Sequence, residues 1–203
     1  MINDKTDKLH LKALKLSYFT VGYNIIECIV SIIAGFIAGS TALLGFGSDS
    51  LVESLSGIIM IWRFRKHKNI SKVEEEKIEK KAVIFIGVTF FIFGIYILFE
   101  SFRKLIIHEK PEPSIIGIII AIASIIVMPI LFLSKYKIGK SIGSNSLIAD
   151  SKQTLACLFM SFSLLIGLGL NYLWGLWQAD PIVGLVIVAF LFKEGFELLF
   201  EKE

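Results

Sequence analysis

Long uncharged apolar runs dominate the chain, and each has the length that crosses a membrane as a helix. Residues 82–99 and 114–134 contain no charged side chain, and neither does the run over 153–179. A transmembrane helix needs about 20 mostly apolar residues to span ~30 Å of hydrocarbon. These continuous runs therefore predict helices, because the strands of a β-barrel would alternate apolar and polar residues.

Two further runs supply the remaining spans. Residues 16–48 carry a single charged side chain, Glu27, but the run is too long for one helix, and Gly39-Ser40 provides a turn within it. A cleaved signal peptide is the alternative for its first part, although the run is longer than the apolar core of such a peptide. The last run is apolar from Pro181 to Phe192. We predict six spans, over residues 14–38, 41–63, 79–104, 114–136, 146–173 and 179–199.

Positive charge is distributed unevenly between the connections. Residues 1–13 contain three lysines, and residues 63–81 contain eight Lys and Arg. Because cytoplasmic connections carry an excess of Lys and Arg, we predict that both termini face the cytoplasm from the inner or plasma membrane. We interpret 63–81 as a basic cytoplasmic connector, with an amphipathic helix over 72–81 as the alternative. The chain ends soon after the sixth span, so we expect one transmembrane domain over 14–200 and no C-terminal soluble domain.

The composition agrees with an all-α integral membrane protein and excludes other classes. Hydrophobic residues make up 55% of the 203-residue chain and charged residues 19%, which is too apolar for a soluble domain. A net charge of +3 gives no reason to expect nucleic acid as a partner. Two cysteines without a CxxC pair do not build a disulfide scaffold. No Gly-rich phosphate loop or HExxH motif occurs, so we expect a transporter rather than an enzyme.

Two acidic residues interrupt the second predicted span. Asp49 and Glu53 are four residues apart, so both carboxylates lie on one face of a helix. A charged side chain at mid-bilayer costs about 2.5–3.5 kcal/mol, and two like charges repel unless a proton or a cation joins them. The pair therefore suits a site that exchanges a divalent cation for protons. The alternative is a pair that faces a water-filled vestibule or a lysine, for which Lys152 is the nearby candidate on another span.

A weak internal repeat supplies partners for this pair. The segment that ends at Glu53 aligns with the segment that ends at Cys157, and the alignment superposes Asp49 on Gln153. If the two helices cross, two carboxylates, an amide oxygen and a thiolate converge as a four-coordinate metal site. Taken singly, Cys157 is typical of a buried apolar position, and Gln153 is typical of a hydrogen bond between helices.

Three further polar residues are candidates for a proton relay or an ion pathway. Asn24 and Glu27 belong to a polar stripe on one face of the first span, which should point into the bundle. Glu27 is either a gate or relay for protons, or a partner in a hydrogen bond between helices. Asp150 opens the fifth span, where the helix dipole favours a first-turn acid, and it could also line the cytoplasmic mouth.

The order of these motifs resembles the cation diffusion facilitator family. The resemblance rests on the six spans, the STALL segment that leads to Asp49 and Glu53, the LIAD segment that opens the fifth span, and the Asp-Pro start of the sixth. It implies a homodimeric secondary antiporter, here in a short form without the family's C-terminal cytoplasmic domain. The family's first metal-binding pair falls on Asp49 and Glu53. The second, commonly His or Asp followed by Asp, falls on Gln153 and Cys157, so carboxylates or the thiol must carry the protons.

The expected function is the export of a divalent metal in exchange for protons by alternating access. Deprotonated Asp49, Glu53 and Cys157 would bind the cation from the cytoplasm, and protons would displace it outside. A thiolate favours Zn²⁺, Cd²⁺ or Co²⁺, whereas two carboxylates leave Mn²⁺ and Fe²⁺ open. The metal is cargo, no permanently bound cofactor is expected, and the lipid bilayer is the other partner. The alternatives are a metal-binding accessory protein that does not transport, and a small-molecule exporter.

Overall fold

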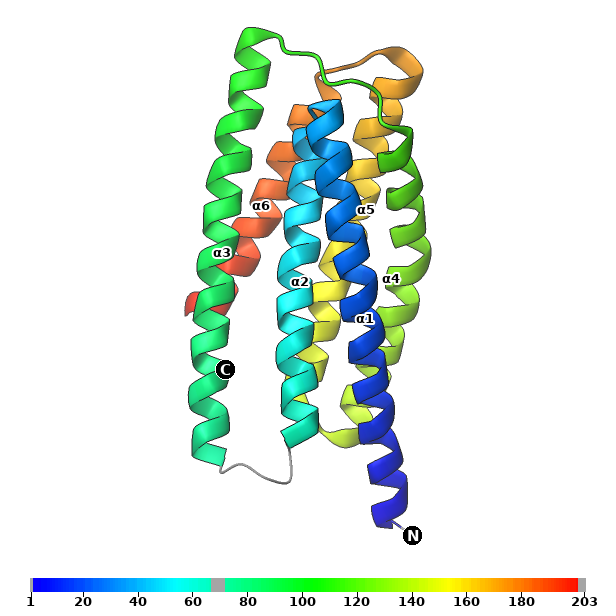
Figure 1. Cartoon of the computed structure of the whole chain (residues 1–203), viewed down its shortest axis with the longest axis vertical. Coiled ribbons are helices and arrows are strands. Elements are labelled where there is room, and N and C mark those ends of the chain that lie inside the picture. Colours follow the sequence, from blue (N-terminus) through cyan, green and yellow to red (C-terminus); the bar gives the residue numbers. More distant parts are fainter. Residues whose placement is uncertain (1, 67–71, 201–203) are drawn as a thin grey trace.

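The computed structural model describes residues 2–66 and 72–200, and the regular elements in these ranges are α-helices (Figure 1). The expected all-α fold with six helices is therefore confirmed. The helices are α1 (Ile2–Ala38), α2 (Thr41–Lys66), α3 (Lys72–Ile107), α4 (Ile115–Ile142), α5 (Asn145–Trp174) and α6 (Ala179–Phe200).

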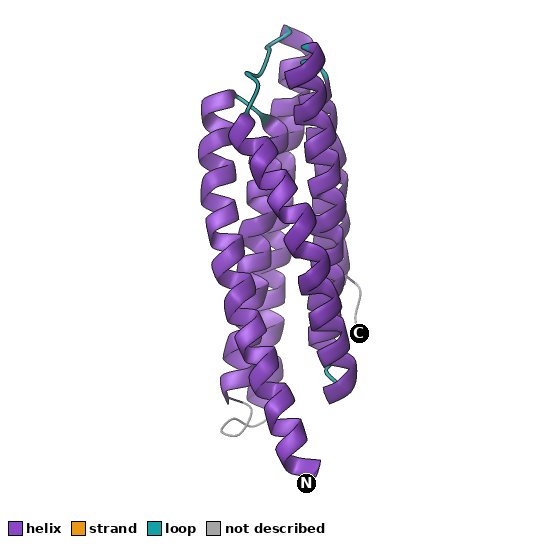
Figure 2. Cartoon of the chain, turned by 90° about the vertical axis from the view of Figure 1, so that its right-hand side faces the viewer, coloured by secondary structure: helices purple, strands orange, loops and turns teal. Residues whose placement is uncertain are grey.

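Successive helices run in opposite directions along the long axis of the molecule (Figures 1 and 2). The amino terminus and the α4–α5 turn lie at one end of the bundle, which we call the N-terminal end. The α1–α2, α3–α4 and α5–α6 connections lie at the opposite end, which we call the far end. α2 therefore starts at the far end, whereas α5 starts at the N-terminal end.

The bundle is apolar on its outside and holds many of its polar side chains inside. Four helices, α1, α2, α4 and α5, contain a described stretch that is long and apolar enough to cross a membrane. Large hydrophobic side chains such as Ile37, Phe99 and Ile106 are exposed, as contact with lipid requires. Acidic, serine and threonine side chains are buried between the helices. This distribution is that of an all-helical, multi-pass membrane protein.

Two segments that hydropathy assigned to a tail and a connector are helical. α1 begins at Ile2, so it includes most of the predicted tail over 1–13. Residues 72–81 form the first turns of α3, so the preference for a connector there was wrong. Residues 67–71 of the predicted connector lie outside the described residues. Lys and Glu are strong helix formers, which explains why these helices continue beyond their apolar parts.

Glycines on α2 allow α1 to pack closely against it. A Cβ atom at Gly57 would lie 2.5 Å from Val21 Cγ2, and one at Gly47 would lie 2.8 Å from Ile32 Cγ1. Small residues let helix backbones approach each other in lipid, where packing drives association. This packing places the polar stripe of α1 against the helix that carries the acidic pair.

Matching serine caps fix the starts of α2 and α5. The Ser40 hydroxyl accepts a hydrogen bond from the Leu43 N–H at 3.0 Å, and the Ser144 hydroxyl accepts one from the Leu147 N–H at 3.3 Å. Such a cap satisfies an N–H group that the start of a helix leaves open. Glu53 and Cys157 each lie thirteen residues after their cap, about 20 Å along the helix. Because the two helices start at opposite ends and the 26 residues of α2 span about 39 Å, these two positions lie at similar depth.

A contact at the far end ties α6 to the start of α2. The Asp180 carboxylate accepts hydrogen bonds from the Thr41 N–H at 2.8 Å, from the Thr41 hydroxyl at 3.0 Å and from the Ser40 hydroxyl. Asp180 is fully buried and lies in the first turn of α6. The first turn of α6 thus holds the first turn of α2 in place.

Candidate metal centre

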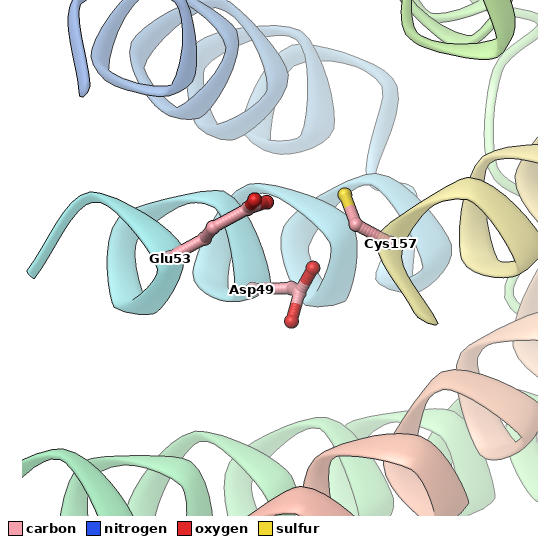
Figure 3. Close-up of side chains that lie close together, drawn as sticks. All are labelled: Asp49, Glu53 and Cys157. Carbon is pink, nitrogen blue, oxygen red and sulfur yellow. The ribbon is translucent and has the colours of Figure 1, made fainter. Parts of the chain in front are cut away.

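Two side chains of α2 and one of α5 come together inside the bundle (Figure 3). One carboxylate oxygen of Asp49, one of Glu53 and the Cys157 Sγ atom all lie within 4.8 Å of one another. Asp49 and Glu53 share a face of α2 because they are about one helical turn apart. Cys157 meets them from α5, at the depth at which the two helices pass each other. Three of the four residues that the sequence suggested as metal ligands therefore lie close together in the structure.

Each carboxylate of this cluster has one oxygen atom that forms no hydrogen bond within the described part of the chain. Asp49 Oδ2 and Glu53 Oε2 are buried without a hydrogen-bond partner among the described residues. Asp49, Glu53 and Cys157 are all buried, so solvent does not replace the missing partners. Leaving a buried polar atom unsatisfied costs about 1–3 kcal/mol, and more for a charged group. A cation bound by these two carboxylates would remove that cost.

The donor set suits a transition-metal ion in size. Zn²⁺ bonds to oxygen at about 2.0–2.2 Å and to sulfur at about 2.3 Å, which separates the ligand atoms of a tetrahedron by roughly 3.3–3.8 Å. The cluster, with separations of up to 4.8 Å, needs a contraction of about 1 Å to hold such an ion. Small rotations of the side chains cover a change of that size.

Gln153, the fourth residue of the hypothesis, lies one turn before Cys157 on α5. Its side chain is half-buried, and its Nε2 atom has no hydrogen-bond partner among the described residues. The hydrogen bond between helices that was considered for this amide is therefore not formed through Nε2. The assignment of Gln153 as a fourth ligand stays a prediction.

A buried lysine that hydropathy did not reveal adjoins the cluster. Lys135 lies on α4 and is completely buried. Its Nζ atom lies 2.9 Å from Asp150 Oδ2 and 3.5 Å from Glu53 Oε1. Thr154 completes the network, because its hydroxyl donates to Glu53 Oε1 at 2.6 Å and accepts from Lys135 Nζ at 2.8 Å. One ammonium therefore faces a carboxylate of the cluster and a second carboxylate beside it.

Two details of this network differ from what the sequence suggested. The lysine partner considered as the alternative for the acids is present at Glu53, but it is Lys135 and not the exposed Lys152. Asp150 is not a first-turn acid, because α5 begins at Asn145 and Asp150 belongs to the following turn. It is buried, paired with Lys135, and accepts a hydrogen bond from the Ser56 hydroxyl at 3.4 Å. Asp150 is therefore an internal counter-ion to the lysine, and the helix dipole does not explain it.

The spacing of residues on α4 contained the signal for Lys135. Small and apolar residues recur there at every third or fourth position, which marks the buried face of a helix. Lys135 continues that series, so it faces the interior although it lies near the end of the apolar run. The buried positions of α4 are Gly117, Ala121, Ser124, Met128, Leu131, Lys135 and Gly139.

The polar stripe of α1 faces the interior, where it meets α2. Glu27 accepts hydrogen bonds from the Tyr23 hydroxyl at 3.1 Å and from the Ser50 hydroxyl of α2 at 2.8 Å. The hydrogen bond between helices that was considered for Glu27 is thus present. Asn24 is completely buried, and neither of its amide atoms has a partner within the described part of the chain. Glu27 therefore contacts the helix that supplies the acids, and Asn24 is buried about one turn before it on α1.

Comparisons with known proteins agree with this architecture. The family model for the cation efflux transmembrane domain matches residues 17–202. Transmembrane protein 163 of Xenopus laevis is 27% identical over 191 residues, which cover 94% of this chain and 67% of that protein. Protein p34 of Rickettsia prowazekii is 25% identical over 187 residues, covering 90% of this chain and 62% of that protein. An uncharacterized transporter of Methanocaldococcus jannaschii is 28% identical over 182 residues, covering 86% and 63%.

This chain therefore spans about two thirds of the length of these relatives. The family match over residues 17–202 takes in most of the helical bundle, including Asp49, Glu53 and Cys157.

Proposed function

Because the chain belongs to the cation efflux family and is a membrane cation transporter, we propose that its cargo is a divalent transition-metal ion held by Asp49, Glu53 and Cys157. One observation carries the proposal: two carboxylates with unsatisfied buried oxygens and one sulfur converge within 4.8 Å in the bundle interior. Ionisable groups in such a place are costly and typically mark an ion pathway. The resemblance to the cation diffusion facilitator family, seen in the sequence, is confirmed by the family match.

The ligand types favour Zn²⁺ among the candidate cargoes. A thiolate selects Zn²⁺, Cd²⁺ or Co²⁺ over Mg²⁺ and Ca²⁺, which prefer oxygen ligands. The two carboxylates also accept Mn²⁺ and Fe²⁺, which bind harder ligands. Gln153 supplies the fourth ligand through its amide oxygen, and this completes a tetrahedral set. We therefore place Zn²⁺ first and treat Cd²⁺ and Co²⁺ as close competitors.

Exchange for protons follows from the chemistry of the ligands. A carboxylate or a thiolate binds a metal only when it is deprotonated, so protons and the metal compete for the same atoms. We propose that the metal binds when the site is open to the cytoplasm and that protons displace it after the site opens to the outside. Glu27 and Asn24, which are both buried on α1, form the proposed path for these protons. Asp150 is better assigned to the ion pair with Lys135 than to this path.

The distribution of positive charge supports an orientation of the bundle in the membrane. We propose that the N-terminal end faces the cytoplasm of the inner or plasma membrane, because the segment over 63–81 carries eight Lys and Arg. The family resemblance further supports a homodimer. Protons that enter down their gradient would then drive the metal out of the cell.

Flux measurements on the purified protein test this proposal. Proteoliposomes with an imposed pH gradient should accumulate Zn²⁺ with the wild type, and Asp49→Asn should remove most of this uptake. Cys157→Ser should reduce Zn²⁺ uptake, while Cys28→Ser, at the other buried cysteine, serves as its matched control and should behave like the wild type. Equal rates for the wild type and Asp49→Asn would refute the assigned ligands. Metal binding without any flux would favour the accessory role over transport.

A further inference from the structure

The buried ion pair between Lys135 and Asp150 lies beside the metal centre, and neither residue is among the proposed ligands. An ammonium inside a membrane protein is costly to hold unless it is paired. Lys135 lies 2.9 Å from Asp150 Oδ2 and 3.5 Å from Glu53 Oε1, and it is completely buried. Because Glu53 is a proposed ligand, the ammonium and the metal act on the same carboxylate.

The two oxygens of Glu53 have different surroundings. Oε1 accepts the Thr154 hydroxyl at 2.6 Å and faces Lys135 Nζ at 3.5 Å. Oε2 is buried without a partner among the described residues and is the oxygen left for a cation. The nearer contact, from Thr154, therefore orients the carboxylate. Lys135, at the longer distance, acts on it mainly through its charge.

Asp150 keeps the ammonium in place independently of Glu53. The contact of Lys135 with Asp150 is the shorter of its two ion pairs, and Thr154 also accepts from its Nζ at 2.8 Å. The lysine is thus anchored by groups outside the proposed ligand set. Its positive charge stays beside the centre whether or not Glu53 binds a metal.

We propose that Lys135 is a fixed counter-charge that sets the affinity of the metal centre. This inference rests on the proposed function, because it assigns the lysine a role toward the transported cation. The ammonium offsets one negative charge of the site and repels a doubly charged ion held at Glu53 Oε2. Affinity is thereby kept low enough for the metal to leave, which a transporter needs as much as binding. Lys135 is a positioning residue that acts through Glu53, and it is not a ligand.

Binding and transport by matched variants of the full chain test this role. Lys135→Met, which keeps the bulk and removes the charge, should lower the Kd for Zn²⁺ by roughly tenfold or more in titration calorimetry. In proteoliposomes the same variant should show a lower KM and a lower kcat, because release becomes slow. Lys135→Arg keeps the charge and should restore a Kd within about threefold of the wild type. Thr154→Val, which removes the orienting contact, should raise the Kd instead.

A structural role alone predicts a different result for Lys135→Met, namely weaker or unchanged binding, and either outcome overturns the inference. If that variant does not fold, the pair Lys135→Met with Asp150→Asn avoids an unpaired buried carboxylate. It should still lower the Kd, but by less than the single change, because one attractive negative charge is lost with the ammonium. Asp49→Asn, measured in the same series, separates the two proposals. Binding lost in Asp49→Asn without tightening in Lys135→Met overturns this inference alone. Binding unchanged in Asp49→Asn overturns the proposed function and this inference together.

Discussion

The contact between Asp180 and the start of α2 makes a quantitative prediction about stability. Replacing Asp180 by alanine removes the acceptor for the Thr41 N–H and for the hydroxyls of Thr41 and Ser40. All three residues are completely buried, so water is not available to replace the lost acceptor. The change therefore frees donors at the first turn of the helix that carries the acidic pair.

The size of the effect follows from these contacts. A buried N–H without a partner costs about 1–3 kcal/mol, and the hydroxyls of Thr41 and Ser40 lose an acceptor as well. We expect Asp180→Ala to destabilise the protein by about 3 kcal/mol. Asp180→Asn keeps one acceptor oxygen in the same place, and we expect it to cost about 1 kcal/mol.

Thermal unfolding of the purified protein in detergent measures this difference. At about 2–4 °C per kcal/mol for a chain of this size, Asp180→Ala should lower Tm by about 6–12 °C. The Kd for Zn²⁺ of the folded variant should stay close to the wild-type value, because Asp180 lies at the far end and outside the cluster. A Tm for Asp180→Ala equal to that of Asp180→Asn would show that the contact does not hold α2 in the way described.

Three further predictions concern the site and the packing. Cys157→Ser should shift selectivity from Cd²⁺ toward Mn²⁺ in competition assays, because an oxygen replaces the soft sulfur, and Cys28→Ser should not. The affinity for Zn²⁺ should fall as the buffer is made more acidic, because protons compete for the ligands; a pH-independent Kd in calorimetry would contradict this. Gly57→Val should cost about 1–3 kcal/mol in thermal unfolding through overlap with Val21, whereas Gly169→Val, at a position with open space, should be nearly neutral.

The sequence predicted the number of helices and the faces of the acidic residues because both depend on local spacing. Uninterrupted apolar runs define a membrane helix, and a spacing of four residues places Asp49 and Glu53 on one face. The internal repeat located Cys157 opposite them, because it aligned two helix starts whose serine caps lie at opposite ends of the bundle. Polar residues that follow a helical period could therefore be placed without coordinates.

The partners of the buried groups depend on contacts between helices, which spacing within one helix does not specify. Lys135 was missed because hydropathy reads a lysine near the end of a span as part of a connector. Its partners come from two other helices, Glu53 on α2 and Asp150 on α5. Nothing in the sequence marks Thr154 as part of the site, and its role becomes visible only through the hydrogen bond from its hydroxyl to Glu53. The helical starts of α1 and α3 were missed for a different reason, because a hydropathy profile marks the apolar part of a helix and not its ends.

The uneven polarity of the helices bears on how the chain is inserted into the bilayer during synthesis. Among the four candidate spans, α2 is the least apolar and α4 the most. The apolar window of α2 is 67% buried inside the molecule, against 28% for that of α4. α4 is therefore apolar enough to insert into the bilayer despite Lys135, whereas α2 needs neighbouring helices to shield Asp49 and Glu53 from lipid. We expect α1 and α2 to leave the translocon together as a hairpin. The close contacts at Gly47 and Gly57 would then hold α1 against α2 and shield the acidic residues of α2 from lipid.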